Sequence, residues 1–133
     1  MKKTKPSDLE LQVLSVLWES GPLTVRGLLD ALPDGKKRAY TTVLSVVQVM
    51  EKKGLVTHER RGLAHVYRPM VKQGQVLQPL LRELTRNVFG GSPASVLQFL
   101  LKGSDVSEAE LAEIRRLVGN VETSSEDEEE SGL

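Results

Sequence analysis

A short run of hydroxyl-bearing side chains opens one of the most regular apolar patterns in the chain. The segment YTTVLSVVQVMEKKG starts at Tyr40, and its apolar residues recur at spacings of three and four, which predicts a helix with one buried stripe. That stripe contains Val43, Val46, Val47 and Met50. The hydroxyls would then be exposed at the amino end of the helix. If such a helix enters the major groove of DNA, these side chains can hydrogen-bond to base edges.

The residues that could contact DNA have polar or cationic side chains and lie in this helix, just before it, or in the segment that follows it. Hydroxyls and a glutamine could read bases, and Lys and Arg could meet phosphates. The candidates are Lys37, Arg38, Tyr40, Thr41, Thr42, Ser45, Gln48, Arg60, Arg61 and His65, with Lys36 beside the first two. Taken singly, each is as readily a solvated surface residue, and Arg60 and Arg61 could simply protect a sheet edge. Their common location favours a nucleic-acid interface.

The sequence around these candidates predicts three helices followed by a β-hairpin. Ser7 and Glu10 have the spacing of a capping box at the start of the first helix. Thr24 is the expected N-cap of a short second helix, and the helix that starts at Tyr40 is the third. LVTHER and AHVYRP alternate as strands and are joined by a tight turn at Gly62. Two helices joined by a loop and followed by a hairpin indicate a winged helix-turn-helix.

The remaining sequence changes to leucine-rich helical segments. QVLQPLLRELTRNVF, SVLQFLL and SEAELAEIRRLV each have an apolar stripe, and Pro79 should kink the first of these helices or mark its real start. So few residues cannot bury these stripes by themselves, so a second chain is expected to cover them. The residues expected at that dimer interface are Leu77, Leu80, Leu81, Leu84, Val88, Leu97, Leu100, Leu101, Leu111, Ile114 and Leu117.

These patterns predict a mainly α fold with a small β-hairpin. A winged-helix DNA-binding domain is expected over residues 1–71, a helical dimerisation domain over 72–119 and a disordered acidic tail over 120–133. The formal net charge is zero, but residues 1–72 carry 13 Lys and Arg against 7 Asp and Glu, whereas residues 73–133 carry 5 against 11. A basic first half can attract a polyanion although the whole chain is neutral.

Several function classes lack support in the sequence. The chain has no cysteine, which removes thiol catalysis and disulfides. His58 and His65 could bind a metal with Glu59, but strand alternation puts Glu59 on the opposite face from His58, so a surface pair of histidines is the preferred interpretation. No catalytic residues, metal ligands or cofactor site are expected. No membrane span or signal peptide is visible, so a cytoplasmic protein is the default expectation.

Three stretches resemble a known family: LELQVLSVLWESGPLTVRGLLDAL, AYTTVLSVVQVMEKKGLVTHERRGLAHVYRP and SEAELAEIRRLV. Together they resemble the penicillinase repressor family, over about residues 7–118. That family includes the beta-lactamase, methicillin-resistance and copper-responsive CopY-type repressors. The resemblance implies a winged-helix domain, a helical dimerisation domain and a homodimer that represses transcription at a palindromic operator. By position, Thr41, Thr42 and Ser45 fall where members read the operator, and Tyr40 falls near the DNA backbone.

The resemblance also bears on how repression ends. In antibiotic-responsive members a membrane sensor leads to cleavage in a helix of the dimerisation domain, before a Phe and usually after an Asn. The matching pair here is Gln98–Phe99, with Gln in place of the usual Asn. Cleavage at this pair is one signal that could disrupt the dimer, and a sensor-linked protease is the candidate partner that would make the cut. Val49 stands where the family often has Arg, and Leu63 stands where it often has Arg or Lys. The absence of cysteine excludes the thiolate copper sensing of the CopY type.

The sequence therefore predicts a homodimeric repressor that binds double-stranded DNA at a palindromic operator. The alternative is a winged-helix protein-interaction module without sequence-specific DNA binding, because a fold does not fix a function. The basic first half and the polar start of the third helix favour the repressor.

Overall fold

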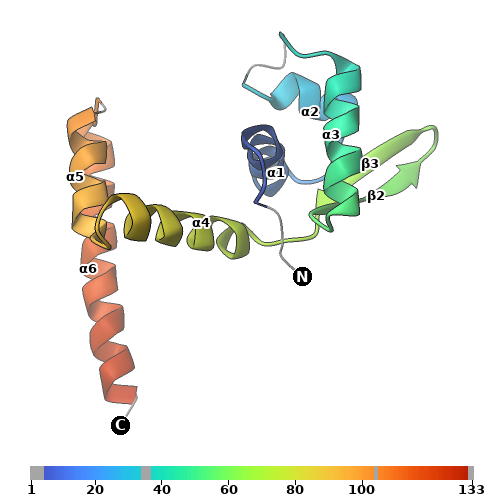
Figure 1. Ribbon diagram of the computed structural model, residues 1–133. Coiled ribbons are helices and arrows are strands. Elements are labelled where there is room, and N and C mark those ends of the chain that lie inside the picture. The colour runs from blue at the N-terminus through green and yellow to red at the C-terminus, as the bar shows by residue number, and fades with distance from the viewer. Residues whose placement is uncertain (1–4, 34–36, 104, 132–133) are drawn as a thin grey trace. The chain divides into compact units, whose positions relative to one another are not determined.

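The computed structural model describes residues 5–33, 37–103 and 105–131 of the 133-residue chain, with side chains as far as residue 121. The chain divides into two compact units, residues 1–82 and 83–133. The elements of the first unit are α1 (Asp8–Ser20), β1 (Leu23–Thr24), α2 (Val25–Ala31), α3 (Tyr40–Lys52), β2 (Val56–Arg61) and β3 (Ala64–Pro69) (Figure 1). Helix α4 (Gln73–Val88) crosses the division, and α5 (Pro93–Gly103) and α6 (Glu108–Ser131) complete the second unit.

Local side-chain caps fix where the first two helices start. The Ser7 hydroxyl accepts a hydrogen bond from the backbone N–H of Glu10 at 3.2 Å, and the Glu10 carboxylate accepts one from the N–H of Ser7 at 2.8 Å. This reciprocal pair is the predicted capping box. Thr24 is also the N-cap it was expected to be, because its hydroxyl accepts from the N–H of Gly27 at 3.0 Å. Both predicted caps are confirmed.

The predicted hairpin is present, and it belongs to a three-stranded antiparallel sheet of order β1-β3-β2. Gly62 has a φ of 62°, a left-handed conformation that glycine adopts without strain, and it turns β2 into β3. Strand β1 was not predicted. It consists of Leu23 and Thr24, which pair with Tyr67 and Val66 of β3. Two residues are too few to show an alternating pattern, so this strand exists only through its tertiary partner.

The core of the first unit lies between the three helices and the sheet. Among the described residues, the apolar side chains buried there are Val13, Leu14, Leu17, Val25, Leu28, Leu29, Leu32, Val43, Val47, Met50, Val56 and Tyr67. Each such burial contributes about 1.5–3 kcal/mol, so this core stabilises the position of α3. Trp18 lies at the edge of the core, and its indole N–H donates to the backbone carbonyl of Val71 at 2.9 Å.

The carboxyl-terminal helices bear on two expectations from the sequence. Pro79 lies inside α4, which starts at Gln73, so the proline does not mark the start of the helix. Helix α6 continues to Ser131, and the disordered acidic tail expected over residues 120–133 stays a prediction. Glutamate is a good helix former, and adding residues to an existing helix avoids the cost of nucleation. The division of the units falls after Arg82, and the predicted boundary after residue 71 stays a prediction.

Among the described residues, no helix has the length and apolar character needed to cross a bilayer.

Candidate nucleic-acid interface

Helix α3 has a buried side and an exposed polar side. Of its four predicted core residues, Val43, Val47 and Met50 are fully buried and Val46 is half-buried. The opposite side presents Thr41, Thr42, Ser45 and Gln48, all of them exposed. We call these four residues the reading face. Each of them can donate and accept hydrogen bonds, which is what the recognition of base edges requires.

The amino end of α3 can also accept an anion. The N-cap residue, Ala39, makes no side-chain hydrogen bond to the helix. The first N–H groups of a helix lack partners within it, and such ends bind phosphate. Lys37 is exposed and Arg38 is half-buried just before this end, whereas Lys36 lies outside the described residues. This end of α3 therefore combines backbone donors with cationic side chains.

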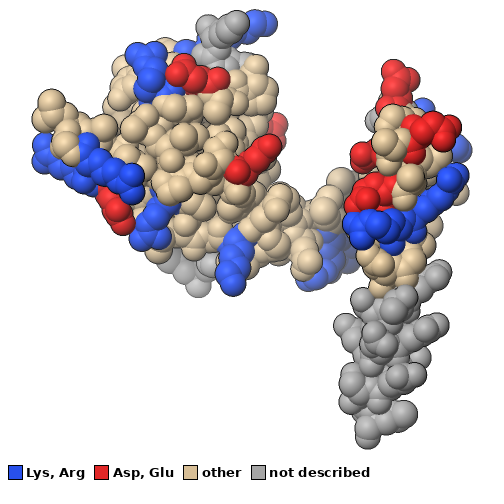
Figure 2. Space-filling model, turned by 180° about the vertical axis from the view of Figure 1, so that it is seen from behind, with Lys and Arg blue, Asp and Glu red and all other residues tan. Residues whose placement is uncertain are grey.

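The hairpin of β2 and β3, which we call the wing, carries cations on both faces. Arg60 pairs with His65 and Arg61 with Ala64 across the two strands. Since neighbouring residues of a strand point to opposite faces, Arg60 and His65 share one face and Arg61 lies on the other. All three side chains are exposed. Figure 2 shows Lys and Arg side chains gathered along this projecting hairpin.

A histidine pair ties the wing to α3. Nδ1 of His58 lies 2.8 and 3.0 Å from the two carboxylate oxygens of Glu51, in the last turn of α3. The ring of His65 stacks on the ring of His58, with 4.4 Å between their centroids. Tyr67 pairs with His58 across the two strands, and its ring centroid lies 5.2 Å from that of His58. Burial raises the pKa of Tyr67, and the charge of Glu51 adds to that effect.

The sequence predicted that His58 and His65 would be neighbours, and this is confirmed. It did not identify the contact between Glu51 and His58, because a helix end and a strand have no fixed spacing. Among the described residues, no group of three His, Cys, Asp or Glu side chains could hold a metal ion.

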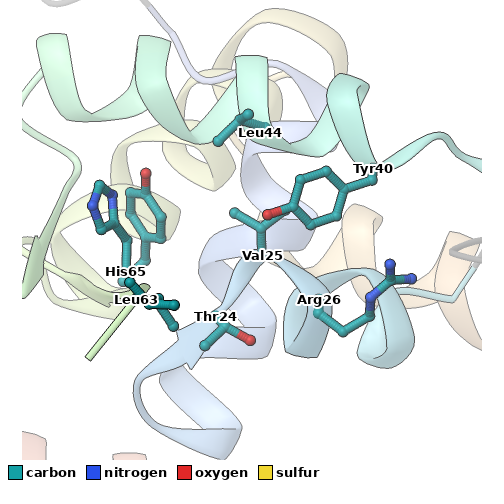
Figure 3. Close-up of a pocket in the computed structure, with 9 residues that line it drawn as sticks. Thr24, Val25, Arg26, Tyr40, Leu44, Leu63 and His65 are labelled. Carbon is teal, nitrogen blue, oxygen red and sulfur yellow. The ribbon is translucent and has the colours of Figure 1, made fainter. Parts of the chain in front are cut away.

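A hollow of about 360 Å³ separates the wing from the start of α3. It is lined by Thr24, Val25, Arg26, Tyr40, Leu44, Leu63, Ala64, His65 and Tyr67. Figure 3 shows the phenol of Tyr40 pointing from α3 toward Val25 of α2. The guanidinium carbon of Arg26 lies 5.4 Å from the centre of the Tyr40 ring, within cation–π distance.

Arg26 is a candidate that sequence reasoning missed. It is exposed in the first turn of α2 and lines the same hollow as Tyr40 and His65. Three elements thus place a guanidinium, a phenol and an imidazole around one concavity, where a sugar-phosphate strand could be held. Its position in the sequence could have identified Arg26 as a candidate, because it lies two residues after the Thr24 cap, in the helix that precedes α3.

The second unit and α4 present apolar side chains to solvent. Within residues 73–103, which are all described, no side chain of α4 or α5 is buried. Of the residues predicted at a dimer interface, Leu77, Leu80, Leu97, Leu101, Leu111 and Ile114 are half-buried, and Leu81, Leu84, Val88, Leu100 and Leu117 are exposed. Apolar surface of this extent is typical of an interaction site.

The residues of the predicted cleavage pair both lie on the surface of α5. Gln98 is exposed and Phe99 is 69% exposed. The rings of Phe89 and Phe99 meet edge to face, with 5.3 Å between their centres. The structure places this pair, the reading face and the wing cations at accessible positions, while their roles stay predictions.

Three helices with a wing define the first unit as a winged helix-turn-helix, and comparison with known proteins gives its family. The family model described as penicillinase repressor matches residues 6–120, so the chain belongs to the penicillinase repressor family. This is a family of transcriptional repressors rather than of enzymes.

Two curated relatives agree with this assignment. The transcriptional regulator BlaI of Mycobacterium tuberculosis is 32% identical over 125 residues, which cover 91% of this chain and 88% of the relative. The penicillinase repressor of Bacillus licheniformis is 20% identical over 112 residues, which cover 84% and 88%.

Two solved structures are similar in part. One is the monomeric form of Bacillus licheniformis BlaI in complex with the blaP half-operator, with a TM-score of 0.46, 25% identity, and coverage of 55% of this chain and 89% of that one. The other is a MarR family protein from Bacillus stearothermophilus, with a TM-score of 0.48, 21% identity, and coverage of 90% and 74%.

Proposed function

We propose that this chain is a transcriptional repressor that binds a palindromic DNA operator as a homodimer. The observation that carries the proposal is the reading face on α3, an exposed row of hydroxyls and one amide on a winged helix-turn-helix. In this fold the second helix of the motif enters the major groove with its amino-terminal residues on the base edges. Membership in a family of repressors supports the same function.

Thr41, Thr42, Ser45 and Gln48 act as base readers in this proposal. The cations around them, Lys37, Arg38, Arg60, Arg61 and Arg26, contact the phosphates together with the polar side chains of Tyr40 and His65. Phosphate contacts position the winged helix without distinguishing sequences, whereas the reading face discriminates between bases. The two roles predict different consequences when a residue of either group is replaced.

Dimerisation is proposed from the apolar side chains that α4, α5 and α6 leave uncovered. A second copy of the chain is the occupant we propose, because two winged helices joined in this way match the twofold symmetry of a palindromic operator. Half-sites would then lie about one helical turn of DNA, or a small multiple of it, apart.

Repression would end when a signal disrupts the dimer. One such signal is cleavage between Gln98 and Phe99, which are both exposed in α5. A cut there would separate α6 and the interface residues Leu111, Ile114 and Leu117 from the winged helix. Loss of the linkage between two DNA-binding units lowers avidity by about 10²–10⁴.

A salt-titrated selection from randomised duplexes, followed by sequencing of the bound fraction, tests the proposal. We expect an enriched palindrome and an affinity that falls steeply as salt rises. Weak binding without any enriched sequence would contradict the repressor and would point to the protein-interaction module instead.

A further inference from the structure

Near its reading face, helix α3 carries one exposed side chain that has no polar group. This residue is Val49. This side chain is 46% exposed, although the other valines of α3 are buried or half-buried. A β-branched residue on the solvent side of a helix gains little from packing, and its helix propensity is lower than that of Ala, Leu or Lys. The fold of the chain therefore gives no reason for a valine at this position.

Val49 extends the reading face by one turn. With about 3.6 residues per turn, Val49 lies about 20° from Thr42 around the helix axis and about 40° from Ser45. It follows Thr42 by about 10 Å along the axis. Residues three, four and seven positions apart share one face of a helix, so Thr42, Ser45 and Val49 can meet the same groove.

The reading face offers methyl groups and has no charge. From Tyr40 to Met50 the sequence contains no Lys or Arg, which are the side chains that bind guanine in a bidentate way. The C5-methyl group of thymine is the apolar group that a base displays in the major groove. The two threonine methyls and the Val49 side chain are matched to that group.

We propose that Val49 contacts the C5-methyl group of a thymine in each operator half-site and thereby determines part of the sequence specificity. This inference rests on the DNA-binding function proposed above. One buried methyl contact is expected to change affinity about fourfold, which corresponds to ~0.8 kcal/mol. A dimer on a palindrome makes the contact twice, so the expected change for the whole operator is about 15-fold.

The first experiment runs the selection from randomised duplexes in parallel for the full-length wild-type chain and Val49→Ala. Because Val49 is exposed, the alanine variant should fold normally, and equal thermal unfolding midpoints check this. We expect the wild-type chain to enrich thymine at one position of each half-site. Val49→Ala should lose that preference while it keeps the rest of the palindrome. Its affinity for random duplex should be unchanged.

The second experiment replaces that thymine by uracil, which pairs identically but lacks the C5-methyl group. Wild-type binding should weaken about 15-fold when both half-sites are changed, whereas Val49→Ala should bind the two duplexes equally. Val49→Thr keeps one methyl group and should retain part of the discrimination. Uracil at a thymine outside the half-sites is the matched DNA control. Combining each protein variant with each duplex isolates the pairwise contact.

The outcomes separate this inference from the function on which it rests. If the wild-type chain enriches a palindrome but Val49→Ala shows the same loss with uracil as the wild type, Val49 does not read the methyl group and only the inference fails. If the wild-type chain enriches no sequence, the DNA-binding repressor fails and the inference fails with it.

Discussion

The ammonium group of Lys53, just after the carboxyl end of α3, lies 3.1 and 3.0 Å from the two carboxylate oxygens of Glu10 in the first turn of α1. Glu10 is only 4% exposed. Burial raises the pKa of Glu10, but hydrogen bonds from Ser7 and the charge of Lys53 outweigh that effect and hold the pKa below its ordinary value of 4.5. The helix that carries the reading face is thus anchored to α1 by a largely buried charge.

Glu10→Gln should lower the free energy of unfolding at neutral pH and make that free energy depend less on pH in the acid range. A carboxyl whose pKa is lowered by folding contributes stability above its unfolded pKa, near 4.5, and loses it as the pH falls through the folded value. We expect a loss of about 1–3 kcal/mol at neutral pH for Glu10→Gln, with a smaller further loss below about pH 4.5 than the wild type shows. Urea unfolding across this pH range measures both, and Glu19→Gln, an exposed position on α1, is the control. Parallel stability curves for wild type and Glu10→Gln would contradict the assignment.

Thr42→Ala should weaken discrimination between operator and random DNA by about 1–3 kcal/mol, because the hydroxyl is proposed to meet a base edge. Its affinity for random duplex should stay as in the wild type. Competition binding with operator and random duplexes gives the ratio. Ser15→Ala removes an exposed hydroxyl from α1 and should leave the ratio unchanged. An unaltered ratio for Thr42→Ala would remove Thr42 from the reading face.

Arg60→Ala should weaken binding to every sequence and reduce the slope of log affinity against log salt by about one, as expected for the loss of one phosphate contact. Arg60 shares the wing face of His58 and His65, which faces α3, whereas Arg61 lies on the opposite face. Arg61 is also proposed to contact a phosphate, so Arg61→Ala should reduce the slope as well. Lys102→Ala, at an exposed position of α5 outside the winged helix, is the control and should leave the slope unchanged. An unchanged slope for Arg60→Ala would remove Arg60 from the proposed phosphate contacts.

Leu84→Asp should convert the proposed dimer to a monomer at micromolar concentration, because it places a charge in the apolar stripe of α4. Arg82→Asp introduces the same residue on the opposite side of that helix and should leave the dimer intact. Sedimentation velocity distinguishes the two states. If Leu84→Asp sediments as a dimer, the interface lies elsewhere on the chain.

A chain that ends at Gln98 should bind the operator about 10²–10⁴-fold more weakly than the full chain, because it loses the linkage between two winged helices. Its winged helix should unfold at the same temperature as that of the full chain, which shows that the loss is not a failure to fold. A shortened chain that still dimerises would place the trigger for derepression away from Gln98–Phe99.

Local signals made much of the winged helix predictable from sequence. The capping box of Ser7 and Glu10 and the cap at Thr24 depend on neighbours three residues away, so their spacing in the sequence is enough to identify them. The wing strands and the turn at Gly62 were predicted for the same reason. The order of the elements and the candidate readers came from the residue pattern, and the family resemblance that agreed with them is now shown by the match over residues 6–120.

The features that were missed depend on contacts between distant residues. Strand β1 exists because Leu23 and Thr24 meet β3, and no pattern within two residues signals such a pairing. The ion pair of Lys53 with Glu10 crosses 43 positions of the chain, and Arg26 reaches the hollow only because α2 packs beside α3. Such relationships follow from the packing of elements rather than from their individual sequences.

Trp18 gives the chain an intrinsic optical probe. It is the only tryptophan in the sequence, and its indole N–H is bonded to the carbonyl of Val71 in the segment that leads into α4. Release of this segment would expose the indole to water and shift its fluorescence to longer wavelengths. Since Trp18 belongs to α1 and the reading face to α3, DNA binding alone should leave the emission wavelength unchanged. Fluorescence of the unlabelled protein can therefore distinguish release of the segment around Val71 from binding of the reading face to DNA.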